Sequence, residues 1–105
     1  MVVAFDFDKT LDDLRIQILC KKLVSERNEV WVVTARKDND YNNSILKPVL
    51  DRVMLSKYNV IYCNNKPKAE MLKMLNADIY IDNINDEFEI ISNHSNTIPL
   101  LWSSQ

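Results

Sequence analysis

Residues 2–10 read Val-Val-Ala-Phe-Asp-Phe-Asp-Lys-Thr, a short apolar run that ends at two acids. The run at residues 2–5 has the length and composition of a buried β-strand. Asp6 and Asp8 follow it with a spacing of two residues, which places both carboxylates on one side of the chain as it leaves the sheet. This stretch therefore predicts a strand whose carboxyl end presents two acids.

Similar apolar runs recur along the chain and alternate with helical patterns. Four further strands are predicted at residues 29–35, 59–63, 77–81 and 97–102. Apolar residues at helical spacing lie between them, at residues 16–23, 46–54, 71–75 and 88–91. This alternation favours a parallel sheet covered by helices on both faces. We predict one α/β domain over residues 1–105, with a three-layer Rossmann-like fold and a five-stranded parallel sheet in which the first strand lies between the second and the fourth.

Composition narrows the class of protein. Hydrophobic residues make up 47% of the chain and charged residues 27%, a balance typical of a soluble globular protein. Cys20 and Cys63 are expected to be reduced thiols, so we expect a cytoplasmic protein. No apolar stretch approaches the roughly 20 residues that span a bilayer, so we expect no membrane partner. Two cysteines cannot form a disulfide framework, and a net charge of −2 gives no general attraction to nucleic acid.

The sequence has no glycine, so another residue must end its helices. Asparagine tolerates the left-handed conformation better than most residues do. Asn28, Asn59 and Asn76 each follow a helical pattern directly. We predict that these three asparagines are left-handed helix ends.

In an open parallel sheet, ligands bind beyond the carboxyl ends of the strands, so the residues at those ends carry most information. The second strand ends in Thr34-Ala35-Arg36, and the fourth ends in Asp82, with Asp86 four residues later. Several acids at one edge would repel one another unless a cation neutralised them, and carboxylate oxygens suit Mg²⁺. The sequence therefore predicts a magnesium site at this edge.

A lysine is also expected there, because a phosphate near carboxylates needs positive charge around it. Lys68 shares the buried face of the third helix and lies at its first turn, which points toward the carboxyl ends of the strands. Lys66 lies just before the helix and is the competing candidate.

These motifs resemble those of the haloacid dehalogenase superfamily of phosphohydrolases. Asp6 to Thr10 is similar to the DxDxT nucleophile motif, Thr34 to the second motif, Lys68 to the third, and Asp82 to Asp86 to the fourth in its DxxxD form. The resemblance implies Asp6 as the nucleophile, Asp8 as the general acid and base, Thr34 as a donor to phosphate oxygens, and Lys68 as the residue that steadies nucleophile and phosphate.

The resemblance also implies a bound Mg²⁺ and a reaction. The ion would be held by Asp6, the backbone carbonyl of Asp8 and Asp82, with Asp86 supporting that shell. The expected enzyme is a magnesium-dependent phosphatase that hydrolyses a phosphomonoester through an aspartyl-phosphate. Position 83 is Asn where many relatives have Asp or Gly. Arg36 either binds substrate phosphate or covers the sheet edge.

The chain is expected to lack a cap domain. Seventeen residues separate Thr10 from Asn28 and read as one helix, and the segment between Arg36 and Val60 holds one loop and one helix. Closure over the substrate must then come from the polar loop 37–43, from a second subunit of a homo-oligomer, or from a large substrate.

Other functions stay open at this point. A nucleotide or nucleic-acid end phosphatase is one, because five basic residues would cluster near the site: Lys9, Arg36, Lys37, Lys66 and Lys68. A receiver-like signalling domain is another, although no acid follows the third strand, which ends in Cys63-Asn64-Asn65. A catalytically silent, phosphate-binding relative is the third.

Overall fold

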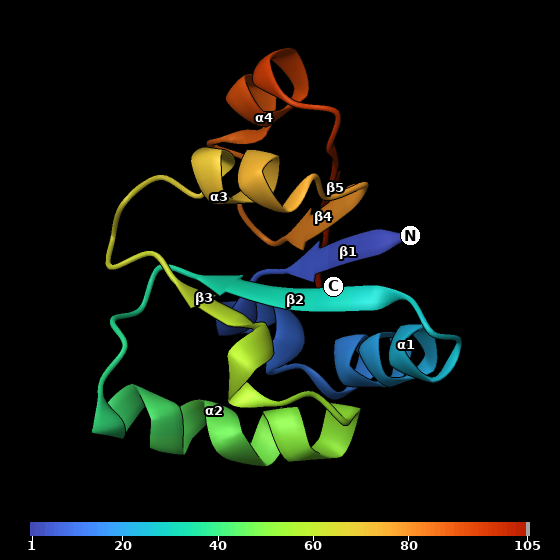
Figure 1. The fold of residues 1–105 in the computed structure, drawn as a ribbon, viewed down its shortest axis with the longest axis vertical. Coiled ribbons are helices and arrows are strands. Elements are labelled where there is room, and N and C mark those ends of the chain that lie inside the picture. Colours follow the sequence, from blue (N-terminus) through green and yellow to red (C-terminus); the bar gives the residue numbers. More distant parts are fainter. Residues whose placement is uncertain (105) are drawn as a thin grey trace.

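The computed structural model describes residues 1–104 and contains a five-stranded sheet in which every neighbouring pair is parallel (Figure 1). The strand order is β3-β2-β1-β4-β5, so the predicted central position of the first strand is confirmed. The strands are β1 (Val2–Phe5), β2 (Glu29–Thr34), β3 (Val60–Tyr62), β4 (Ile79–Asp82) and β5 (Ile98–Leu101).

Helices cover both faces of this sheet, and the three-layer α/β prediction is confirmed. One layer contains α1 (Leu14–Ser25) and α2 (Asp40–Val53), and the other contains α3 (Ala69–Leu75) and α4 (Phe88–His94) (Figure 1). Within residues 1–104, no helix has both the length and the apolar character needed to cross a membrane.

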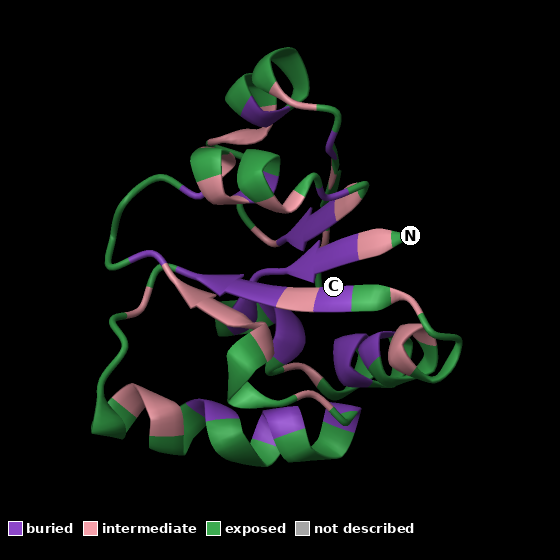
Figure 2. Cartoon of the chain, viewed as in Figure 1, coloured by how far each residue is buried: buried purple, intermediate pink, exposed green. Residues whose placement is uncertain are grey.

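Strand alternation divides the core between the two faces. Val3 and Phe5 pack toward α1 and α2, whereas Ala4 belongs to the apolar cluster that contains Leu72 of α3 and Ile91 of α4. The central strands are accordingly buried along most of their length (Figure 2). This double burial explains why β1 reads as a continuous apolar run rather than as an alternating one.

Short side chains begin the two helices of the first layer. Asp13 Oδ1 accepts a hydrogen bond of 2.9 Å from the Arg15 N–H at the start of α1. Asn39 Oδ1 accepts one of 2.8 Å from the Asn42 N–H at the start of α2. Both satisfy backbone donors that a helix leaves free at its first turn.

The predicted left-handed helix ends are confirmed at one position and wrong at two. Asn76 ends α3 with φ 51°. The left-handed residues near the ends of α1 and α2 are instead Arg27, with φ 66°, and Met54, with φ 65°.

Asn28 and Asn59 use their side chains in place of a left-handed backbone. Asn28 Nδ2 donates 3.0 Å to the carbonyl of Leu23, which satisfies an acceptor at the end of α1. Asn59 Nδ2 donates 3.0 Å to the carbonyl of Val30 in β2. Both asparagines therefore hold the chain through side-chain hydrogen bonds to backbone carbonyls.

Strand β5 forms one edge of the sheet. The N–H groups of Ile98 and Trp102 donate to β4, at 2.9 Å to the Asp78 carbonyl and 2.8 Å to the Asp82 carbonyl. Because N–H groups alternate in direction along a strand, position 99 faces outward, and that residue is a proline.

Candidate functional site

An open cleft of about 760 Å³ lies at the carboxyl ends of β1 and β4. Most residues expected at the site line it, among them Asp6, Asp8, Lys66, Lys68, Asp82 and Asp86. The sheet order explains this gathering, because β1 and β4 are adjacent and end at the same edge. The cleft therefore brings together most of the residues that the sequence predicts at the site.

A wide turn after β1 fixes Asp6 at the floor of the cleft. The Leu11 N–H donates 3.2 Å to the Asp6 carbonyl, and Lys9 adopts a left-handed conformation with φ 60° to make the turn. The Thr10 hydroxyl donates 3.1 Å to Asp6 Oδ2. Neighbouring residues in the sequence, Thr10 and Leu11, thus hold Asp6 independently of the other elements.

Lys68 forms an ion pair with Asp6 inside the protein. Its Nζ lies 2.6 Å from Asp6 Oδ1, and both side chains are largely buried. Burial raises the pKa of Asp6 to about 6 although Lys68 opposes this rise, and the nearby carboxylate of Asp82 adds to it. Burial alone would lower the pKa of Lys68, but the two carboxylates outweigh it and hold that pKa above its ordinary value. Lys68 is therefore a permanent cation beside Asp6.

The start of α3 selects Lys68 over Lys66. The Glu87 carboxylate accepts hydrogen bonds from the backbone N–H groups of Lys68 at 2.9 Å and Ala69 at 3.1 Å, which anchors the first turn of the helix. Lys66 is exposed and lines the cleft farther along the loop. Of the two candidate lysines, the structure brings Lys68 to Asp6.

Tyr80 is a site residue that the sequence reasoning missed. Its buried hydroxyl donates 2.5 Å to Asp82 Oδ2 and accepts 3.0 Å from Lys68 Nζ. The Ile84 N–H donates 3.0 Å to Asp82 Oδ1, so both oxygens of Asp82 are fixed. The signal was present in the sequence, because Tyr80 lies two residues before Asp82 in a strand and so points to the same side.

Three oxygens of the site converge on the side chain of Asn83. Its amide is assigned with the nitrogen inward, because the opposite orientation would point an oxygen at three acceptors. Nδ2 then donates 3.0 Å to Asp6 Oδ2, 3.1 Å to the Asp8 carbonyl and 3.2 Å to Asp82 Oδ1. These three oxygens are the expected Mg²⁺ ligands, and the Asn83 amide forms a hydrogen bond with each of them.

This donor set fits a magnesium ion. Mg²⁺ takes hard oxygen ligands from one or two carboxylates and keeps several waters, which an open cleft can supply. Within residues 1–104, no three His, Cys, Asp or Glu side chains are grouped as metal ligands. The fit depends instead on two carboxylates, Asp6 and Asp82, together with the backbone carbonyl of Asp8.

The Asp8 side chain points to Arg36 and not to Asp6. Arg36 Nη2 lies 2.7 Å from Asp8 Oδ1, and Nε lies 3.1 Å from Oδ2, a two-pronged contact. Arg36 also donates 2.7 Å to Asn42 Oδ1 and lies over the ring of Phe7, with its guanidinium carbon 5.7 Å from the ring centroid. Asp8 therefore turns its carbonyl, and not its carboxylate, toward Asn83 and the expected Mg²⁺ ligands Asp6 and Asp82.

Two other expected site residues, Thr34 and Asp86, lie apart from the group formed by Asp6, Lys68 and Asp82. Thr34 is fully buried, and its Oγ1 accepts 3.2 Å from the Arg36 N–H, while its neighbour Ala35 lines the cleft. Asp86 is exposed on the wall of the cleft. The hydrogen bonds that fix Asp82 come from Tyr80 and the Ile84 N–H.

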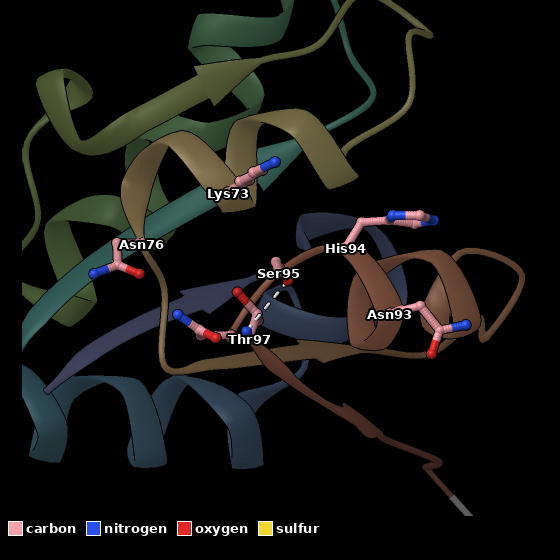
Figure 3. Close-up of a pocket in the computed structure, with 7 residues that line it drawn as sticks. Lys73, Asn76, Asn93, His94, Ser95 and Thr97 are labelled. Atoms are coloured by element: carbon pink, nitrogen blue, oxygen red, sulfur yellow. Dashed lines mark hydrogen bonds between the residues drawn. The ribbon is translucent and has the colours of Figure 1, made fainter.

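A second hollow of about 430 Å³ lies at the opposite end of the strands, near their amino ends (Figure 3). Lys73, Asn76 and His94 line it at the carboxyl-terminal ends of α3 and α4. The Thr97 N–H donates 3.2 Å to Ser95 Oγ across its floor. Among residues 1–104, no Asp or Glu lines this hollow, so it lacks the acids expected at the site.

Comparisons with known proteins place the chain near one viral protein. A protein of Acanthamoeba polyphaga mimivirus, described as uncharacterized, is 29% identical over 97 residues, an alignment that covers 83% of this chain and 19% of the viral protein. The chain thus spans about one fifth of the length of that relative. No family model matches the chain, and no solved structure matches it.

Proposed function

We propose that this chain is a magnesium-dependent phosphatase that hydrolyses a phosphomonoester through an aspartyl-phosphate on Asp6. The single observation that carries the proposal is the buried carboxylate of Asp6, held by Lys68 at 2.6 Å and facing a point shared with Asp82 and the Asp8 carbonyl. The same residues match the motifs that resemble the haloacid dehalogenase superfamily.

Asp6 has the surroundings that a carboxylate nucleophile needs. Attack of a carboxylate oxygen on phosphorus forms an acyl-phosphate and breaks the bond to the leaving oxygen, which splits hydrolysis into two easier steps. Lys68 neutralises charge on the transferring group and keeps Asp6 in place. Bound Mg²⁺ would supply further neutralisation of the phosphoryl oxygens, held by Asp6, Asp82 and the Asp8 carbonyl.

Asp8 and Arg36 can exchange partners when substrate binds. Their contact is half exposed at Asp8, so solvent screens it and an incoming anion can reach Arg36. A phosphate dianion would compete for Arg36, which binds such groups with two parallel hydrogen bonds. The freed carboxylate of Asp8 then takes up a proton from solvent, gives it to the leaving oxygen, and later takes one from the water that attacks the acyl-phosphate.

Hydrolysis of p-nitrophenyl phosphate with Mg²⁺ or EDTA tests the proposal, together with rapid quenching for a phosphoryl-protein that hydroxylamine cleaves. Wild type should hydrolyse the ester only with Mg²⁺, and the quenched protein should carry a phosphoryl group that hydroxylamine removes. Asp6→Asn should lose at least about a thousandfold in turnover, because an amide neither attacks phosphorus nor carries the required charge.

Asp51→Asn is the matched control, since Asp51 is an exposed acid on α2 that pairs with Lys47 at 3.0 Å. That variant should match wild type in every assay. Turnover by Asp6→Asn at the wild-type rate would remove the covalent mechanism.

A further inference from the structure

One wall of the cleft is apolar and open to solvent. Ile84 and Ile90 line the cleft with 55% and 54% of their surface exposed. Packing does not require Ile90 there, because its neighbour Ile91 already anchors α4 in the core with 1% exposure. Two large aliphatic side chains therefore face the space in front of the site without serving the fold.

This wall begins directly beside the reacting groups. Ile84 follows Asn83, whose amide contacts Asp6, and the Ile84 N–H binds Asp82. A group bonded to phosphorus at Asp6 can therefore lie against this wall within the open cleft. Lys9 and Lys66 line the same cleft and supply positive charge for a phosphate.

We propose that the substrates are phosphomonoesters of apolar alcohols, and that Ile84 and Ile90 determine this specificity by packing against the leaving group. The inference rests on the proposed phosphatase function and names its substrate class. A polyol such as glycerol or a sugar would lose water from its hydroxyls against these side chains and gain no hydrogen bond from them. An alkyl chain gains from the same contact.

A series of ethyl, butyl and hexyl phosphate tests the proposal with one leaving-group chemistry. The KM should fall about twofold to threefold per added methylene, somewhat less than full burial of each group would give, while kcat stays constant. Hexyl phosphate should exceed glycerol phosphate at least tenfold in kcat/KM.

Variants locate the effect on the wall. Ile84→Ser and Ile90→Ser should each flatten the chain-length dependence, so that hexyl phosphate loses a larger factor in kcat/KM than ethyl phosphate does. Ile18→Ser is the matched control, because Ile18 lies on α1 with 71% exposure and does not line the cleft. That variant should keep the full dependence.

The outcomes separate the two proposals. If no ester is hydrolysed, p-nitrophenyl phosphate included, the proposed function fails and this inference fails with it. If p-nitrophenyl phosphate is hydrolysed but ethyl and hexyl phosphate have equal KM values, only the substrate class is overturned. Preference for a 3′-phosphorylated oligonucleotide over hexyl phosphate also overturns it.

Discussion

Charged side chains are buried at the carboxyl ends of the strands, here called the carboxyl edge of the sheet, and exposed at their amino ends, the amino edge. At the carboxyl edge, Asp6, Lys68 and Asp82 retain only 6%, 8% and 7% of their surface exposure. At the amino edge, Lys73 and His94 border a hollow of their own but remain exposed to solvent. Both edges have a cavity, and only one has buried charge.

Buried charge costs free energy that exposed charge does not, because the protein interior solvates ions poorly. The chain carries this cost where three ionisable groups meet a common point and avoids it at the other edge. Substitutions at the carboxyl edge should therefore alter ligand binding and catalysis more than folding, and substitutions at the amino edge should alter folding alone.

The largest effect is expected at Asp82. Mg²⁺ that binds only the folded state should stabilise wild type by about 2.7 kcal/mol at a hundredfold excess over Kd, which thermal melts resolve easily. Asp82→Asn should remove most of that gain and spare the melting temperature in EDTA, because it relieves repulsion with Asp6. If the variant keeps the whole Mg²⁺ shift, the cation position is wrong.

A smaller effect is expected at Tyr80. Tyr80→Phe removes the hydroxyl that orients Asp82 and contacts Lys68, and loss of such outer partners costs about 10–100-fold in metal affinity or activity. Mg²⁺ titration followed by melting temperature measures this without turnover. Tyr62→Phe is the control, because its hydroxyl bonds Asn43 away from the cleft, and equal Mg²⁺ affinity in both variants would exclude a role for Tyr80.

The third prediction uses pH on the metal-free protein. The pKa of Asp6 is raised from 3.8 to about 6, so the folded state binds a proton more tightly than the unfolded state does. The stability that this proton gives is complete below about pH 4 and is lost as pH rises through about 6. Urea unfolding in EDTA should show this decline in wild type and a flatter profile in Asp6→Asn. An unchanged profile in the variant would assign the decline to another group.

The smallest effect belongs to the amino edge. Met54 ends α2 with φ 65°, and a left-handed conformation costs a non-glycine residue about 1–2 kcal/mol. Met54→Gly should raise the free energy of unfolding by about 0.5–1 kcal/mol, after the greater entropy of glycine in the unfolded chain is subtracted. Asn76→Gly should gain less, because asparagine tolerates this conformation. Urea denaturation compares them, and a loss of the proposed phosphatase activity in either variant would contradict the division between the two ends of the strands.

The parallel sheet was predictable because each strand repeats one simple pattern. Its order was predictable because the acidic ends of the first and fourth strands and Thr34 were expected to share one crevice. Apolar runs alternate with helical spacing, and a parallel sheet follows from that alternation whatever the individual side chains are. The position of Lys68 was predictable for a similar reason, since a helix that follows a strand must begin near the carboxyl edge. These inferences depend on the order and direction of strands and helices, which the hydrophobic pattern of the sequence indicates.

Side-chain direction was less predictable, because it depends on partners far away in sequence. Asp8 turns to Arg36, 28 residues later, and Asn83 turns inward to oxygens on β1 and β4. The left-handed residues Arg27 and Met54 are poor choices by residue type, and their conformation is imposed by how α1 and α2 join the next element. Tyr80 alone among the missed residues could have been found, from its spacing to Asp82.

Pro99 also bears on how copies of this chain can associate. An edge strand normally offers outward N–H groups to any extended segment, and this is a common route to aggregation by strand addition. The proline removes one such donor from the middle of the exposed side of β5, a strand of only four residues. A second copy or a misfolded neighbour therefore finds too few donors to extend the sheet, although Ile98 and Leu101 remain exposed beside it. The backbone of this edge is therefore a poor template for strand addition, although apolar side chains lie on it.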